Sequence, residues 1–305
     1  MCAFNILRIY IIKGKRLQIR HGPPLLYLLD MLKKEQFFHN NSKIYENKIT
    51  SQKFGPTPRS DILYGENIMN INTQTILVTG ANGGIGKALI NAFLAAGAKK
   101  IYACARNTAS LEPLRNNEKI LPVQLDISKP ADIENVVAAC GDTTILVNNA
   151  GMGGSGLLGA PQAARAEMEV NYFGTLAMCS AFAPILGNNG GGCIVNIISV
   201  IGLVNMPSIG TYCASKAALH SLTQGLRGVL AGQKTTVIGV YPGPVDTRMT
   251  DGLEMPKARP EAVALEILEG MKNGTEDIYP DAFARSIQKG LAADPKKVER
   301  ELSEY

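Results

Sequence analysis

The sequence of 305 residues, of which 46% are hydrophobic and 19% charged, excludes a broadly disordered, collagen-like or coiled-coil chain. These proportions indicate a soluble globular protein with one large domain and a sizeable core. The net charge is +5, but residues 1–68, with 11 basic and 5 acidic residues, contribute +6 and residues 69–305 contribute −1. The basic balance belongs to the N-terminal segment, so we expect no nucleic-acid surface on the main body.

The six cysteines are scattered and include no C-x-x-C pair, so we expect neither a disulfide scaffold nor a metal site. No apolar run reaches the roughly 18 to 20 residues that a membrane span needs. The N-terminus lacks a charged segment followed by a long apolar one, which argues against secretion. We therefore expect a cytoplasmic protein without a membrane partner.

Two compositions meet near Met69, where an Asn- and Lys-rich segment gives way to Ala- and Gly-rich sequence. We interpret residues 1–70 as a poorly structured or non-native N-terminal extension, which is absent if translation starts at Met69, and residues 71–305 as the main domain. Because no acidic residue precedes Asp30, a transit peptide or a membrane-surface helix stays an alternative. The absence of serine before Ser42 weakens the transit interpretation.

From residue 72 onward, short apolar runs alternate with helix-like segments. Runs that are apolar throughout are typical of strands buried on both faces of a sheet. The alternation predicts a doubly wound parallel sheet of the Rossmann type, a three-layer α/β/α domain with ligands at the carboxyl ends of the strands. We expect strands at 75–78, 101–105, 121–125, 144–147, 193–198 and 235–241, and helices at 84–96, 130–139, 163–186, 212–230 and 261–270.

A glycine-rich turn, residues 79–86, directly follows the first predicted strand and opens a helix. The unpaired N–H groups and the positive dipole end of that helix suit a pyrophosphate, and glycines let the backbone approach it. A P-loop is disfavoured because five residues separate Gly80 from Gly86, where a P-loop has four, and because Ala88 stands where a magnesium-binding hydroxyl would lie. The turn predicts a dinucleotide site.

The end of the second predicted strand indicates which dinucleotide is bound. A carboxylate there would bind the ribose hydroxyls of NAD and repel a 2′-phosphate. The sequence instead has no acid at residues 102–107, and Arg106 can pair with a phosphate. This pattern favours NADP.

The end of the fifth strand and the helix after it carry the candidate chemistry. Tyr212 and Lys216 are four residues apart, so they lie on one helical face about 6 Å apart along the axis. A nearby ammonium favours the phenolate and could bring a phenol into use near neutral pH. Ser199, at the carboxyl end of a strand, could bond a substrate oxygen. His220 and Cys213 are interpreted as packing residues.

Taken together, these motifs resemble the short-chain dehydrogenase/reductase family over about residues 74–250. The resemblance rests on the TGxxxGIG pattern at 79–86, Asp126 in a Leu-Asp-Ile run, the Asn-Asn-Ala-Gly run at 148–151, Asn171, Ser199, Tyr212-x-x-x-Lys216, and the Pro-Gly-Pro-Val-Asp-Thr run at 242–247. It implies a fold with a nucleotide crevice and an oxidoreductase that transfers hydride between NADP and a carbonyl or alcohol.

The resemblance also implies individual roles. Tyr212 would be the general acid or base, Lys216 would lower its pKa and contact the nicotinamide ribose, and Ser199 would orient the carbonyl. Asn171 would hold a water in a proton relay, so the catalytic set is Asn171, Ser199, Tyr212 and Lys216. Asp126 is expected near the adenine, Asn148 near the adenosine ribose and the central sheet, and Thr247 near the carboxamide. The full cofactor-binding set is Gly80, Asn82, Gly84, Ile85, Gly86, Arg106, Asp126, Ile127, Asn148, Ala150, Gly151, Tyr212, Lys216, Pro242, Gly243, Val245 and Thr247.

One departure from the family pattern concerns the cofactor. NADP-type members often carry a second basic residue inside the glycine turn, whereas residues 81–83 are uncharged here, so NAD stays possible. The resemblance further implies a homodimer or homotetramer that pairs the helices at 163–186 and 212–230, with small-molecule substrates and no nucleic-acid partner.

Two other functions stay open from the sequence. One is a dinucleotide-sensing or scaffold protein without turnover, against which the intact Ser199, Tyr212 and Lys216 argue. The other is a dehydratase or epimerase that retains its cofactor, although such enzymes usually have a longer C-terminal domain. We also interpret the segment between Thr247 and residue 261 as a small lid that forms an apolar pocket with Met152, Val200 and Met206, favouring apolar carbonyl compounds.

Overall fold

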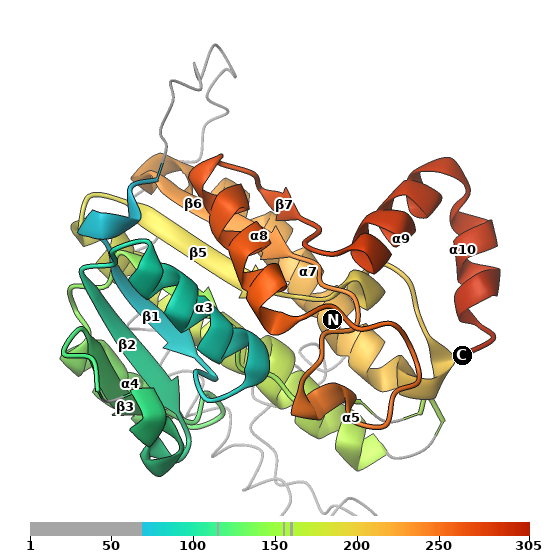
Figure 1. Ribbon diagram of the computed structural model, residues 1–305, viewed down its shortest axis with the longest axis horizontal. Coiled ribbons are helices and arrows are strands. Elements are labelled where there is room, and N and C mark those ends of the chain that lie inside the picture. The colour runs from blue at the N-terminus through green and yellow to red at the C-terminus, as the bar shows by residue number, and fades with distance from the viewer. Residues whose placement is uncertain (1–68, 115, 155, 159–160) are drawn as a thin grey trace, which may run out of the picture. The chain divides into compact units, whose positions relative to one another are not determined.

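The computed structural model describes residues 69–114, 116–154, 156–158 and 161–305, and residues 1–68 of the expected extension lie outside the described part of the chain. Within it, seven parallel strands form one sheet in the order β3-β2-β1-β4-β5-β6-β7 (Figure 1). The strands are β1 Thr75–Thr79, β2 Lys100–Ala105, β3 Ile120–Gln124, β4 Ile145–Asn148, β5 Gly192–Ile197, β6 Thr235–Val240 and β7 Asp277–Ile278. The chain winds outward from β1 to β3 and then resumes at β4 on the other side, so the strand order reverses between β1 and β4. This is the doubly wound sheet that the sequence predicts, and ligands of such sheets bind at the reversal point.

Helices cover both faces of the sheet. On one face α3 (Gly84–Ala95) packs against α8 (Pro260–Lys272) (Figure 1). On the other face α6 (Thr175–Asn188) contacts both α4 (Pro130–Ala139) and α7 (Gly210–Leu230). Successive strand residues point to opposite faces, so Ile76 joins the core under α3 while Leu77 joins the core under α6. Both faces of β1, β2, β4, β5 and β6 are therefore almost entirely buried, which explains why these strands are apolar. The edge strand β3 is more open, and its Leu121 is 40% exposed.

The helix predicted at 163–186 is present and continuous from Pro161 to Asn188, but it contains a π-helical segment that the sequence did not predict. α5 (Pro161–Met168) passes into a π-helical segment, Glu169–Gly174, before α6 begins. Gly174 lies so close to Ile127 that a Cβ atom there would be 2.8 Å from the Ile127 Cγ1 atom. Tight packing of this segment against the loop after β3 accompanies its wider turn, and π-helical turns are frequent at functional sites.

The stretch Pro161–Asn188 is, within the described residues, long and apolar enough to cross a membrane by length and composition. Its apolar residues Met178, Phe182 and Leu186 are fully buried against the sheet and its neighbouring helices. Such packing is typical of a core helix in a globular domain.

The C-terminal region holds elements that the sequence did not predict. β7 has only two residues, and it is followed by α9 (Ala282–Ala293) and α10 (Pro295–Leu302). These helices bury Ala284, Val298 and Leu302 in an apolar cluster that includes the segment after β5. Short 3-10 helices complete the described chain: Ile71–Thr73, Thr108–Leu114, Val200–Gly202, Pro207–Ile209, Ala231–Gln233 and Arg248–Thr250.

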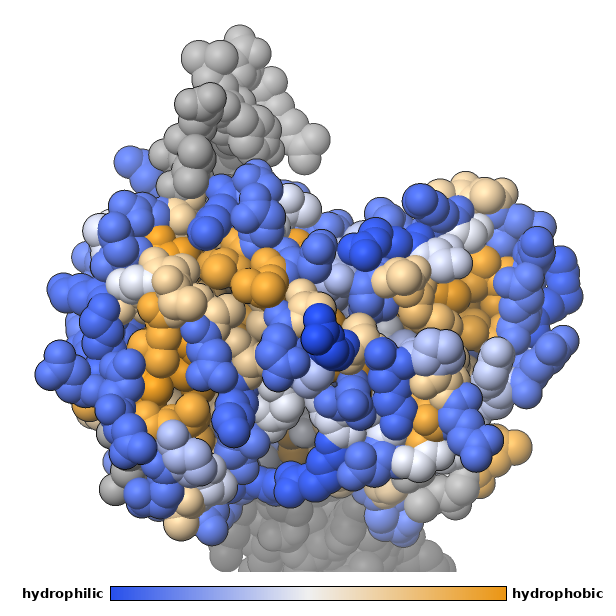
Figure 2. All heavy atoms as spheres, in the orientation of Figure 1, coloured by the Kyte–Doolittle hydropathy of each residue, from blue (hydrophilic) through white to orange (hydrophobic). Residues whose placement is uncertain are grey.

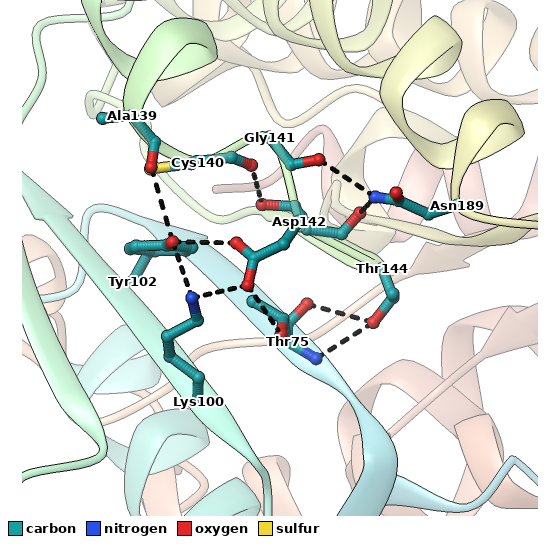
Figure 3. Close-up of polar contacts among 10 residues, drawn as sticks. Thr75, Lys100, Tyr102, Ala139, Cys140, Gly141, Asp142, Thr144 and Asn189 are labelled. Carbon is teal, nitrogen blue, oxygen red and sulfur yellow. Dashed lines mark hydrogen bonds and ion pairs between the residues drawn. The ribbon is translucent and has the colours of Figure 1, made fainter.

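A polar cluster lies toward the amino ends of the central strands (Figure 3). Tyr102 Oη donates to Asp142 Oδ1 at 2.8 Å and accepts from Lys100 Nζ at 2.9 Å. Lys100 Nζ also pairs with the other Asp142 oxygen. The cluster ties β2 to the loop before β4 at the edge of the sheet opposite the carboxyl ends of the strands.

The outer surface of the face that carries α3 and α8 is mostly hydrophilic, with apolar strips between the charged and polar side chains (Figure 2). This distribution is typical of an amphipathic helical layer with its outer side open to water.

Candidate functional site

The glycine turn lies at the carboxyl end of β1, as predicted. Gly80 has a φ of +63°, which favours glycine, and a Cβ atom there would be 2.9 Å from the Ala150 Cα atom. Ala81 N donates to Cys104 O at 2.9 Å, which holds the turn beside the end of β2. Gly83 precedes α3 and makes no side-chain cap, since glycine has no side chain, so within the described residues the start of this helix lacks the usual N-cap hydrogen bond. Such a helix start suits a phosphate.

Asn149 and Thr79 hold the turn, and neither was among the predicted site residues. The Asn149 side-chain amide donates to the carbonyl oxygens of Thr79 and Gly80, each at 3.0 Å. In return, the Thr79 hydroxyl accepts from the backbone N–H groups of Asn149 and Ala150. The Asn-Asn-Ala-Gly run is the signal that could have identified this clamp, since it follows β4, the neighbour of β1.

Arg106 and Asp126 follow β2 and β3, next to the turn. The Arg106 side chain is exposed, and Asp126 Oδ1 accepts from the Ser128 hydroxyl at 2.7 Å. Burial raises the pKa of Asp126, but the Ser128 hydrogen bonds and the charges of Lys129 and Arg106 outweigh it, so the pKa is lower than usual. The adjacent Ile127 is buried against the π-helical segment. A cation and a carboxylate are thus available where the adenosine end of a dinucleotide would lie.

Asn148 lies inside the sheet. Its side-chain amide donates to Asn196 Oδ1 at 2.9 Å, and the Asn196 amide donates to the Thr223 hydroxyl at 2.9 Å. All three side chains are at most 3% exposed. The side chain of Asn148 therefore connects β4 to β5 and α7, while the residues after it, Ala150 and Gly151, lie beside Gly80 and Lys216.

Tyr212 and Lys216 come together on α7, as their spacing predicts. Lys216 Nζ lies 5.5 Å from the centroid of the Tyr212 ring and donates to Ile197 O at 2.9 Å. A Cβ atom on Gly151 would be 3.6 Å from Lys216 Nζ, so the ammonium lies directly against the Asn-Asn-Ala-Gly run and thereby near the glycine turn. Lys216 is only 4% exposed, and Tyr212 is half-buried.

The electrostatics of this pair differ from the expectation that Lys216 lowers the pKa of Tyr212. Burial raises the pKa of Tyr212, and the nearby Cys213 and Glu167 act in the same direction. Burial also lowers the pKa of Lys216 to about 8. At neutral pH the phenol is thus protonated, and the ammonium beside it keeps its charge.

Asn171 lies in the π-helical segment and is fully buried. Its side-chain amide donates to the Ser215 hydroxyl at 2.8 Å, and the same hydroxyl donates to Tyr212 O at 2.8 Å. Its Oδ1 atom accepts from Met152 N at 3.0 Å. Asn171 therefore connects the loop after β4 to the turn of α7 that carries Tyr212. Ser215, which the sequence reasoning did not select, is the connecting residue.

Ser199 follows β5, and its hydroxyl donates to Pro242 O at 3.1 Å. Pro242 begins the loop after β6, and in this loop Val245 is buried and Thr247 half-buried. The loop reaches over the start of α3, because a Cβ atom on Gly84 would be 3.0 Å from the Thr247 Cβ atom. Ser199 and the loop after β6 therefore lie at the carboxyl ends of the strands, where the glycine turn also lies.

Two of the expected pocket residues lie elsewhere. Val200 is fully buried and Met206 is 6% exposed, and both pack in an apolar cluster with Cys213. Met249 is 53% exposed and lies near Gly153, whose Cβ position would be 3.5 Å from the Met249 Cγ atom. Met249 therefore gives the loop after β6 an exposed apolar side chain beside the loop after β4.

The residues present fit a dinucleotide. The start of α3 has no side-chain cap, and Gly80 has no side chain to keep a ligand away from the backbone, so both suit the phosphates. The charges of Lys216 and Arg106 suit an anionic ligand. No group of three or more His, Cys, Asp or Glu side chains that could hold a metal is found among the described residues.

Comparisons with known proteins identify the family of this chain. The family model of the short chain dehydrogenases matches residues 74–257. A short chain dehydrogenase from Burkholderia cenocepacia J2315, solved in complex with NADP, is 39% identical, with 77% of this chain and 99% of that chain covered and a TM-score of 0.74. The NADPH-dependent 1-acyldihydroxyacetone phosphate reductase of Saccharomyces cerevisiae is 33% identical over 73% of this chain and 81% of its own length. The 2-(R)-hydroxypropyl-CoM dehydrogenase of Xanthobacter autotrophicus is 32% identical over 63% of this chain and 83% of its own length. The chain belongs to the short-chain dehydrogenase/reductase family of oxidoreductases.

Proposed function

We propose that residues 71–305 form an NADP-preferring oxidoreductase domain that interconverts a carbonyl compound and its alcohol, with Tyr212 as the general acid or base. The observation that carries the proposal is the buried ammonium of Lys216, which lies 5.5 Å from the Tyr212 ring centroid and against Gly151, beside the glycine turn. A proton donor and a glycine turn suited to a nucleotide are thus connected through Lys216 and Gly151.

The chemistry of each residue follows from its protonation state and position. NADPH supplies the hydride when it is bound. In carbonyl reduction Tyr212, held protonated by burial, donates its proton to the substrate oxygen as negative charge develops there. The adjacent Lys216 ammonium stabilises the resulting phenolate. Because the one proton of the Ser199 hydroxyl goes to Pro242 O, Ser199 Oγ orients the substrate oxygen as an acceptor, by accepting from the hydroxyl of the alcohol. Asn171 holds the π-helical segment and a water for proton return.

The preference for NADP is supported by Arg106, whose exposed guanidinium follows β2 where a 2′-phosphate would lie. The 39% identical relative was solved with NADP, and the yeast relative is named for its use of NADPH. The uncharged residues 81–83 leave NAD as a weaker second cofactor.

We further propose that the enzyme works in the cytoplasm as a homodimer or homotetramer. The five cysteines within the described residues are free, as is usual in a reducing compartment. Phe173 and Val229, at the segment before α6 and on α7, are 49% and 68% exposed and offer apolar surface for pairing between subunits.

The test is a panel of carbonyl compounds with NADPH and NADH, assayed by cofactor oxidation for the wild-type protein and for Tyr212→Phe. We expect Tyr212→Phe to lower kcat by at least about a hundredfold, because general acid catalysis contributes about that much. Its affinity for NADPH, measured by fluorescence titration, should stay within a few fold of the wild type.

Tyr102→Phe is the matched control, because Tyr102 also adjoins a lysine but lies at the opposite edge of the sheet (Figure 3). It should keep wild-type kcat. Equal rates for wild type and Tyr212→Phe would refute the mechanism. NADPH binding without any net oxidation would favour a sensor, or a dehydratase or epimerase that restores its cofactor.

A further inference from the structure

The peptide group between Pro242 and Gly243 is held from both sides. Its carbonyl oxygen accepts from the Ser199 hydroxyl at 3.1 Å and from Val200 N at 3.0 Å. Its N–H donates to Asp281 Oδ2 at 2.7 Å. Because a peptide group is planar and rigid, whatever fixes the N–H also fixes the direction of the carbonyl.

Asp281 is suited to this role. It is 7% exposed and lies directly before α9, where its Oδ1 accepts from Ala284 N at 2.8 Å. Gly243 must be glycine for this approach, since a Cβ atom there would be 2.8 Å from Asp281 Oδ1. The carboxylate therefore serves two donors at once, one from the helix and one from the loop after β6.

The physical consequence reaches Ser199. A hydrogen bond to an ionised acceptor is stronger than one between neutral groups, and a donor so engaged polarises the carbonyl of the same peptide. The polarised Pro242 carbonyl holds the Ser199 proton more firmly, so that Ser199 Oγ is fixed in one direction with its lone pairs free to accept from the hydroxyl of an alcohol substrate. The hydrogen bond from Gly243 N to Asp281 also fixes the start of the loop after β6, in which Thr247 lies beside Gly84 at the start of α3.

We propose that Asp281 is a positioning residue of the enzyme, which sets the Ser199 hydroxyl and the nucleotide-side loop through the Pro242–Gly243 peptide. The proposal rests on the proposed function and deepens it. Asp281 lies beyond residues 74–257, which the family model matches, so this device belongs to the C-terminal part of the chain.

The experiment compares Asp281→Ser with a matched variant, Asp294→Ser. Asp294 precedes α10 and caps it in the same way, with Oδ1 accepting from Lys297 N at 3.0 Å. A serine can cap either helix, but at 281 it is too short to reach Gly243. Both variants thus keep a helix cap, and only Asp281→Ser loses the hydrogen bond from Gly243 N in the loop after β6.

We expect Asp281→Ser to lower kcat by about tenfold, the loss typical of one hydrogen bond to a charged group. Asp294→Ser should stay within about twofold of the wild type, as expected for a site away from the reaction. In Asp281→Ser the amide of Gly243 should also exchange its hydrogen at least about tenfold faster, for the same loss of one hydrogen bond. This last readout needs no substrate.

A double-mutant cycle with Ser199→Ala shows whether Asp281 acts through Ser199. If it does, Asp281→Ser adds little further loss of kcat in the Ser199→Ala background. Fully additive losses, or unchanged Gly243 exchange, would overturn the inference.

Should Asp281→Ser fail to fold, Asp281→Asn replaces it, because its single oxygen can serve only one of the two donors. If the wild-type protein oxidises no cofactor, the proposed function is refuted. Hydrogen exchange at the Gly243 amide would still test whether Asp281 binds that N–H group.

Discussion

Two tyrosine–lysine pairs in this chain differ in what their surroundings allow. Burial raises the pKa of both Tyr102 and Tyr212. Lys100 Nζ donates directly to the Tyr102 hydroxyl and is itself paired with Asp142, so that phenol is fully engaged. Lys216 instead lies over the Tyr212 ring and donates to a backbone carbonyl. Tyr212 is therefore the phenol suited to act on a substrate.

The charge of Lys216 predicts an alkaline limit to activity. Burial lowers its pKa to about 8, so the ammonium is present below that pH and lost above it. Tyr212, with its raised pKa, stays protonated through this range. We expect kcat/KM for carbonyl reduction to fall as the pH rises above about 8 and to level off at lower pH, as measured in a pH profile.

Lys216→Arg provides the check, because a guanidinium keeps its charge at all these pH values. Whatever the absolute rate of Lys216→Arg, the fall of its kcat/KM at alkaline pH should occur at a higher pH than in the wild type. A wild-type profile that stays flat into the range where tyrosines titrate would contradict the assignment of this limb to Lys216.

Arg106 predicts the cofactor selectivity. In Arg106→Glu, a carboxylate replaces the guanidinium after β2, which repels a 2′-phosphate and can bond the ribose hydroxyls of NADH. We expect the ratio of kcat/KM for NADPH over NADH to fall at least about tenfold, in line with the loss of one charged hydrogen bond. Lys119→Glu changes the net charge equally but lies before β3, at the other end of the sheet, and should leave the ratio unchanged. An unaltered ratio in Arg106→Glu would mean that another residue selects the cofactor.

At the scale of elements, the strand ends separate the two functions of the sheet. The carboxyl ends of β1, β4, β5 and β6 lead into the glycine turn, the Asn-Asn-Ala-Gly run, Ser199 and the loop at Pro242. The opposite edge carries the Lys100, Tyr102 and Asp142 cluster. The first edge is therefore available for chemistry, and the second contributes to stability.

The cluster predicts a stability that depends on pH. Burial raises the pKa of Asp142, but hydrogen bonds from Lys100 and Tyr102 outweigh it, so the folded-state pKa is below the ordinary value of 3.8. The carboxylate then stabilises the fold above that value, and this contribution is lost as the pH falls through the lower folded-state pKa. Asp142→Asn should reduce the free energy of unfolding by about 1 kcal/mol at neutral pH, since the pair is partly exposed.

Urea denaturation at several pH values measures this loss, which should shrink toward zero in acid. Glu301→Gln, which removes the exposed pair with Lys297 on α10, should cost close to nothing. An Asp142→Asn deficit that persists unchanged in strong acid would show that packing, and not charge, is the cause.

For the whole molecule, the sequence alone determined the alternation of strands and helices, the glycine turn and the pairing of Tyr212 with Lys216. Each of these features depends on residues only a few positions apart, so the periodicity and spacing of the sequence predict it. The ends of the six predicted strands differ from the ends of β1 to β6 by at most one residue.

Only the tertiary structure decided the rest. Asn149 clamps a turn 70 residues before it, Asp281 holds a peptide 38 residues before it, and β7 is a strand only because β6 lies beside it. The π-helical segment at Asn171 likewise accompanies packing against Ile127. Contacts between segments that are distant in the chain leave no period in the sequence, because they depend on how the layers meet after folding.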